Sequence, residues 1–143
     1  EEPSEKPLNL LSESDFSGKR VLLVEDNDLN QEIAQEILKM AGLTVEIAEN
    51  GKEAVRLFSG MPENYYDMIL MDIQMPLMNG YEAAEALRSM EREDAQNVPI
   101  IAMTANAFAD DVLAAKNAGM NEHIAKPLDM LRLQELLGDY LNR

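Results

Sequence analysis

The chain lacks cysteine and tryptophan, and it has a single histidine, His123. Without cysteine there can be no disulfide, no thiolate metal site and no cysteine nucleophile. One imidazole is too few for the histidine-rich sites that hold zinc in proteins. A metal site in this protein would therefore have to be built mainly from oxygen ligands.

Positive charge and long apolar runs are also scarce. Twelve lysines and arginines oppose 27 acidic residues, which gives a formal net charge of −15. Nucleic acid and anionic membranes repel such a domain, so we expect no binding to either, whereas cations or basic partner surfaces would be attracted. Alternatively, the negative charge only keeps the domain soluble. No apolar run approaches the roughly 20 residues that cross a bilayer, so direct membrane insertion is not expected.

The N-terminal segment differs in composition from the rest of the 143 residues. Residues 1–18 are rich in proline, serine and glutamate, which predicts a linker or tail, although Phe16 and the nearby leucines could dock. Residues 19–143 form one predicted domain. The segment shows no signal peptide and begins with Glu1 rather than methionine. We therefore expect this chain to be a cytoplasmic piece of a longer protein. That parent protein can itself be membrane-anchored.

From residue 19 onward, short aliphatic runs alternate with amphipathic stretches. This alternation predicts an α/β fold, with a parallel sheet covered by helices on both faces. We expect strands within residues 20–26, 43–48, 66–73, 98–105 and 122–127, and five helices within 28–42, 51–60, 79–93, 109–119 and 128–143.

The first predicted helix illustrates the pattern. Ile33, Ile37, Leu38 and Ala41 are predicted to form its buried stripe, and Gly42 is predicted to end it. An alanine and a glycine also close the fourth helix, and both glycines are interpreted as left-handed caps.

Polar residues with useful chemistry follow four of the five predicted strands. Glu25 and Asp26 end the first, Asp72 the third, Thr104 the fourth, and Lys126 follows the fifth. In open α/β sheets, ligands bind at the carboxyl ends of the strands. One acid after a strand means little because loops are polar, but five such residues at one sheet edge favour a functional site.

Three clustered carboxylates repel one another unless a cation joins them, and Lys126 alone cannot neutralise all three. Oxygen ligands suit a hard cation, which favours Mg²⁺, with Mn²⁺ as a possible substitute. A carboxylate is also a covalent nucleophile for phosphoryl groups, and phosphoryl transfer depends mainly on positioning and charge stabilisation. We therefore predict that Asp72 accepts a phosphoryl group with help from Lys126 and a divalent cation.

Four segments in order, LLVEDNDLNQ, MILMDIQMPLMNGYEA, IIAMTANA and HIAKPL, resemble the receiver domain of two-component response regulators. The resemblance covers roughly residues 19–143. It implies a flavodoxin-like (CheY-like) doubly wound sheet with strand order 2-1-3-4-5 and five surrounding helices. It also implies a self-catalysed phosphoacceptor with slow autodephosphorylation, which is not an enzyme as an isolated domain.

The resemblance assigns roles residue by residue. Asp72 matches the phosphorylated aspartate, Asp26 the direct metal ligand and Glu25 its acidic neighbour. The backbone carbonyl of Gln74 matches a further metal ligand, and the Gln74 side chain and Asn106 match positions that tune dephosphorylation.

Three more positions carry the expected switch. Thr104 and Lys126 match the residues that contact the phosphoryl group, and the Lys126–Pro127 bond matches one that is typically cis. His123 stands where the family often has an aromatic switch residue. It is either a half-buried ring at the sheet edge, or an imidazole that swings inward when Thr104 moves and adds pH sensitivity.

Among receivers, these segments most resemble those of hybrid sensor histidine kinases. The implied partner is a histidine kinase or a histidine phosphotransfer domain, and the implied output face consists of the fourth helix, fifth strand and fifth helix. We expect a monomer or weak dimer.

Three alternatives remain open. One is an aspartate-nucleophile phosphatase that acts on free substrates, which usually has a second acid where Gln74 stands. The others are a flavin-binding module, which needs a hydroxyl-rich first loop, and a degenerate receiver that only binds proteins.

Overall fold

The computed structural model describes residues 16–75, 77–105, 109–126 and 128–141. Within these ranges, five strands alternate with six helices. The strands are β1 (Arg20–Val24), β2 (Thr44–Ala48), β3 (Met68–Asp72), β4 (Ile100–Thr104) and β5 (Glu122–Ala125). The helices are α2 (Asp28–Met40), α3 (Gly51–Gly60), α4 (Gly80–Arg88), α5 (Glu93–Asn97), α6 (Ala109–Asn117) and α7 (Met130–Leu141).

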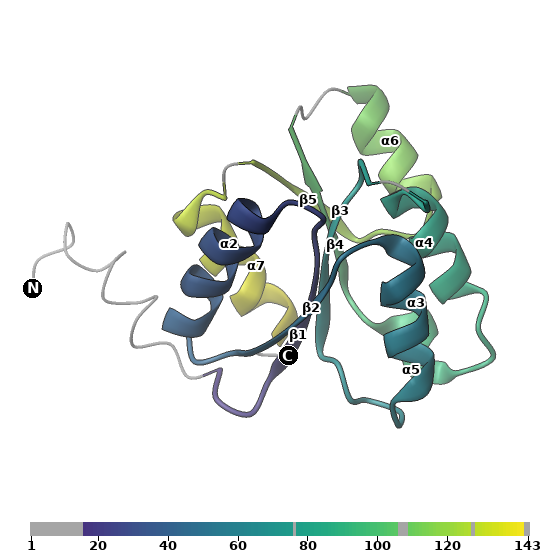
Figure 1. Ribbon diagram of the computed structural model, residues 1–143, viewed down its shortest axis with the longest axis horizontal. Helices are drawn as coiled ribbons and strands as arrows, with labels where there is room; N and C mark the ends of the chain where they lie inside the picture. Colours follow the sequence, from purple (N-terminus) through teal and green to yellow (C-terminus); the bar gives the residue numbers. More distant parts are fainter. Residues whose placement is uncertain (1–15, 76, 106–108, 127, 142–143) are drawn as a thin grey trace, which may run out of the picture.

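All neighbouring strands pair in parallel, in the order β2-β1-β3-β4-β5. This confirms the predicted α/β class and strand order. Helices α2 and α7 cover one face of the sheet, and α3, α4, α5 and α6 cover the other (Figure 1). Because every strand runs in the same direction, the residues that end the strands gather at one edge.

The central strand β3 has apolar residues on both faces, as its sequence predicts. Ile69 and Met71 belong to the core cluster beneath α3, α4 and α5, whereas Met68 and Leu70 belong to the cluster beneath α2 and α7. Such two-sided burial is typical of the middle of a parallel sheet. It fixes β3, and therefore the position of the residue that ends it.

The described ranges hold six helices where five were predicted, because the helix predicted for 79–93 ends early and a short further helix, α5, follows it. Helix α4 ends at Arg88, and the Ser89 hydroxyl donates a hydrogen bond to the Glu85 carbonyl at 2.8 Å. Helix α5 begins after Arg92, which is extended and pairs with the buried Asp94 at 2.9 Å. The predicted continuous helix is therefore wrong at its C-terminal end, where the backbone is extended at Arg92 and the local Arg92–Asp94 ion pair lies at the start of α5.

The stripe predicted for α2 is also partly wrong. Ala34, Leu38 and Ala41 are buried, but Ile33 is 44% exposed. Ala34 takes the inward position in place of Ile33, so the prediction is wrong at the first residue of the stripe.

The predicted left-handed glycines at two helix ends are also found. Gly42 and Gly119 have φ values of +91° and +100°, which confirms their left-handed caps. Phe16 lies inside the predicted linker and is nevertheless buried in the core beneath α2 and α7. None of the helices in the described ranges has both the length and the apolar character needed to cross a membrane.

Candidate functional site

The predicted polar residues meet at the carboxyl edge of the sheet. Asp72 and Thr104 are the last residues of β3 and β4, while Glu25 and Lys126 directly follow β1 and β5. The backbone N–H of Lys126 donates to the Thr104 carbonyl at 2.8 Å, and that of Glu25 donates to the Ala48 carbonyl at 3.0 Å. Both residues are thus fixed by backbone hydrogen bonds beyond the strands.

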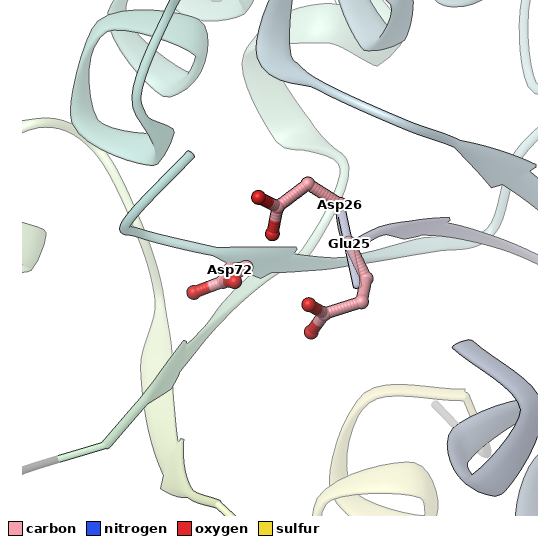
Figure 2. Close-up of side chains that lie close together, drawn as sticks. All are labelled: Glu25, Asp26 and Asp72. Carbon is pink, nitrogen blue, oxygen red and sulfur yellow. The ribbon is translucent and has the colours of Figure 1, made fainter. Parts of the chain in front are cut away.

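Three carboxylates form the centre of the site. One oxygen from each of Glu25, Asp26 and Asp72 lies within 4.8 Å of the others. Figure 2 shows the three side chains around the end of β3. Glu25 and Asp72 are 2% and 4% exposed, whereas Asp26 is open to solvent. Two buried acids and one exposed acid, all with oxygen donors, fit a hard divalent cation that retains several waters.

Lys126 is the cation that the described residues bring to this cluster. Its Nζ lies 3.1 Å from Asp72 Oδ2 and 3.3 Å from Glu25 Oε1. Burial on its own lowers the pKa of Lys126, but the hydrogen bond and charge of Asp72, together with those of Glu25, outweigh burial and raise the pKa overall. The ammonium therefore stays charged and is shared between two carboxylates.

Glu25 is held in an unfavourable environment for a charge. Burial raises its pKa, and the nearby charge of Asp72 raises it further. Hydrogen bonds and Lys126 oppose that rise: Oε2 accepts from the Asn27 N–H at 3.1 Å and from Asn30 Nδ2 at 3.4 Å. A divalent cation at this position would relieve the repulsion between Glu25 and Asp72.

The loop after Asp72 is placed by backbone contacts. The Gln74 N–H donates to Asp72 Oδ1 at 3.1 Å, which orients the carboxylate. Gly80 begins α4 so close to β3 that a Cβ atom there would lie 2.5 Å from the Asp72 carbonyl oxygen. Asn79 caps the helix, and with Glu82 it forms a reciprocal capping box.

Thr104 and His123 share one face of the sheet. His123 pairs with Ala102, and side chains two residues apart on a strand point to the same face, so Thr104 and His123 are diagonal neighbours. Thr104 is buried, and His123 is half-buried beside a shallow cavity of about 150 Å³ that Val112 and Met120 also line. The switch role of His123 stays a prediction.

The structure thus brings Glu25, Asp26, Asp72, Thr104 and Lys126 together. The predictions for Asn106 and for the Lys126–Pro127 bond lie outside the described residues.

Sequence reasoning did not identify three supporting residues, namely Asn27, Gln31 and Gly80. Asn27 could have been identified from the sequence, because an asparagine directly before the first residue of a helix is typical of an N-cap. For the other two, no comparable signal exists, since their roles depend on contacts with strand ends.

Comparison with known proteins agrees with this geometry. The family model for the response regulator receiver domain matches residues 21–138. A peroxide stress-activated histidine kinase of Schizosaccharomyces pombe is 37% identical over 88% of this chain, and hybrid signal transduction histidine kinase I of Dictyostelium discoideum is 36% identical over 89%. The chain spans only 8% and 7% of these two relatives.

Solved structures show the same likeness. The receiver domain of a sensor histidine kinase from Pseudomonas aeruginosa, with a magnesium ion coordinated in its active-site cleft, is 38% identical with a TM-score of 0.79. It covers 89% of this chain, which in turn covers all of that one. A Saccharomyces cerevisiae response regulator receiver, crystallised with a histidine phosphotransfer signalling protein, is 30% identical with a TM-score of 0.80, over 89% and 91% of the two chains.

Proposed function

Because this chain belongs to the response regulator receiver family and is a receiver domain of a two-component phosphorelay, we propose that Asp72 is its phosphoacceptor. The observation that carries the proposal is the buried Asp72 carboxylate at the end of β3, held 3.1 Å from Lys126 and beside two further acids. The boundaries of the receiver, residues 19–143, belong to the same proposal.

The transfer needs no general base. A carboxylate oxygen of Asp72 bonds to the phosphorus of a phosphohistidine, the P–N bond breaks, and the histidine nitrogen keeps the bonding electrons. The nucleophile is a carboxylate, so no proton has to be removed from it. Lys126 and the Thr104 hydroxyl, at the ends of neighbouring strands, would contact the phosphoryl oxygens and would stabilise the charge that develops.

The residues present fit a bound divalent cation. Glu25, Asp26, Asp72 and the backbone carbonyl of Gln74 would hold Mg²⁺, for which Mn²⁺ is a substitute. When bound, the cation neutralises charge on the acids and on the phosphoryl oxygens. The all-oxygen donor set within 4.8 Å supports this assignment, as does the magnesium ion described for the Pseudomonas receiver.

The donor would approach over α2. Leu29 and Ile33 on this helix are 62% and 44% exposed, although both are large apolar side chains. Next to Ile33, a small cavity of about 40 Å³ is also lined by Glu25 and Lys126. An apolar surface beside a reactive group suits a protein donor, either a histidine kinase or a histidine phosphotransfer domain. The yeast receiver crystallised with a phosphotransfer protein supports that class of partner.

Phosphorylation would then change the face formed by α6, β5 and α7. We infer that Thr104 moves toward the phosphoryl group and that His123, its diagonal neighbour, responds. The side chains of Gln74 and Asn106 would set how long the aspartyl phosphate survives. The relatives matched are large histidine kinases, so a hybrid kinase is the proposed parent.

No observation favours the phosphatase alternative. Gln74 stands where such enzymes carry the acid that protonates the leaving group, and its side chain is an amide and not an acid.

The test is phosphorylation by phosphoramidate or acetyl phosphate in the presence of Mg²⁺, followed by intact-mass spectrometry. Wild type should gain one phosphoryl group, and Asp72→Asn should gain none. Asp67→Asn is the matched control, because Asp67 precedes the same strand and accepts from the Arg20 N–H at the opposite sheet edge. This control should gain the group normally. An unmodified wild type, or an equal adduct in Asp72→Asn, would contradict the proposal.

A further inference from the structure

The loop that carries Glu25 and Asp26 is tied back to the sheet by a side chain from α2. Gln31 Nε2 donates a hydrogen bond to the Glu25 backbone carbonyl at 2.6 Å, and the Gln31 side chain is half-buried. This contact is shorter than the 3.4 Å contact from Asn30 Nδ2 to the Glu25 carboxylate. Gln31 is therefore the stronger of the two side-chain contacts between α2 and Glu25.

The loop is fixed at three points. On the strand side, the Glu25 N–H donates to β2. On the helix side, Asn27 caps α2 by accepting from the Asn30 N–H at 2.9 Å. The Gln31 amide spans the loop between these points, so the first turn of α2 and the end of β1 cannot separate without breaking its bond. Asp26, which is exposed, is supported by this frame rather than by packing.

Such support matters for a small cation. Mg²⁺ requires ligands in nearly ideal octahedral positions, and loops hold side chains less precisely than helices or strands do. Residues that orient ligands without touching the metal typically change metal affinity by about 10–100-fold when they are replaced.

We propose that Gln31 is a positioning residue for the divalent-cation site, acting through the Glu25 carbonyl to hold the Glu25 and Asp26 carboxylates toward Asp72. The inference rests on the proposed function only for the identity of the cation site. Gln31 itself contacts neither the reacting atoms nor the cation.

The experiment is a Mg²⁺ titration followed by NMR on the unphosphorylated chain. Gln31→Met keeps the length of the side chain but removes the donor, and the expected result is an affinity at least about tenfold weaker. Gln35→Met is the matched control: the same substitution, one helical turn further along and also half-buried, should leave the affinity unchanged. Asp26→Ala should abolish binding, which establishes that the titration reports this site.

Phosphorylation by acetyl phosphate separates positioning from a merely structural role. Gln31→Met should be slow at low Mg²⁺ and approach the wild-type rate at saturating Mg²⁺, because only the affinity is impaired. Lower stability in urea with unchanged Mg²⁺ affinity would overturn the inference. So would equal losses of affinity in Gln31→Met and Gln35→Met.

A measurement on wild type keeps the inference testable if Gln31→Met does not fold. Mg²⁺ should shift the NMR signal of the Gln31 side-chain amide but not that of Gln35, and an unresponsive Gln31 signal would overturn the inference. The proposed function fails separately: a wild type that binds Mg²⁺ through Asp26 but takes no phosphoryl group would refute only the phosphoacceptor role.

Discussion

Replacing Gly80 with alanine adds one methyl group at the start of α4, where the helix lies against the end of β3. The added Cβ would lie 2.5 Å from the Asp72 carbonyl oxygen and 2.7 Å from the Ile73 Cα. Both are backbone atoms of a buried segment, so neither can rotate out of the way. Helix α4 would have to move away from β3, and the loop that follows Asp72 would move with it.

The magnitude follows from two opposing effects. Alanine is favoured over glycine within a helix by about 1 kcal/mol, and less at a first helical position. Overpacking a well-packed core costs about 1–3 kcal/mol and occasionally more. Because backbone rather than a flexible side chain is in the way, we expect the upper part of that range. Gly80→Ala should therefore lower the free energy of unfolding by about 1–3 kcal/mol.

Gly138→Ala makes the same change in the interior of α7, where an added Cβ meets no atom within 4 Å. This control should raise the free energy of unfolding by up to about 1 kcal/mol. Urea unfolding of the two variants measures the difference, which should be about 1–4 kcal/mol. Phosphorylation by acetyl phosphate should be slowed only in Gly80→Ala. If the two variants were equally stable, close approach of α4 to Asp72 would not be the reason for glycine at this position.

Two further predictions concern side chains away from the site. Arg88 donates at 2.9 Å to the Gly119 carbonyl, the Ala95 carbonyl and Asn121 Oδ1, so Arg88→Met should cost about 2–4 kcal/mol in urea unfolding. A cost no larger than that of Arg56→Met, which removes an exposed ion pair with Glu53, would contradict this. Burial and the hydrogen bond to Glu46 raise the pKa of Tyr66 above its ordinary value of 10.0. Its contribution to stability is therefore complete below about pH 10, where unfolded tyrosine is protonated, and is lost as the pH rises further. Tyr66→Phe should reduce the drop in unfolding free energy between about pH 9 and pH 11, and an unchanged drop would refute the assignment.

The strands and the site were predictable for the same physical reason. A buried strand such as β3 is a run of apolar residues, and the first charged residue after it marks its end, so Asp72 is placed by the pattern itself. Parallel pairing then brings that end next to the end of β1, which Glu25 follows, and one strand away from the end of β5, which Lys126 follows. Tertiary detail enters only in how far apart the side chains lie.

The errors have a different origin. Ile33 fits the periodicity of α2 as well as Ala34 does, and only the packing of the helix on the sheet decides which one turns inward. Helix α5 begins after Arg92, whose side chain donates to the Phe58 carbonyl on α3. A contact between distant segments of this kind leaves no periodic trace in the sequence. The bond between Gln31 and Glu25 spans only six residues, but it was missed because a side-chain bond to a backbone carbonyl leaves no periodic pattern either.

The charge balance of the site links its chemistry to the face formed by α6, β5 and α7. Lys126 is shared between Asp72 and Glu25, at 3.1 Å and 3.3 Å. A phosphoryl group would raise the negative charge carried at Asp72 from one to about two. The attraction of Lys126 to Asp72 would then grow, while its attraction to Glu25 would not. We therefore expect Lys126 to turn from Glu25 toward the phosphoryl group and to leave Glu25 to the amides of α2. Lys126 follows β5 directly, and His123 lies within that strand, so a movement of Lys126 pulls on the element whose exposed side a partner would contact. The two carboxylates that compete for one ammonium thus provide a physical reason for β5 to respond to phosphorylation.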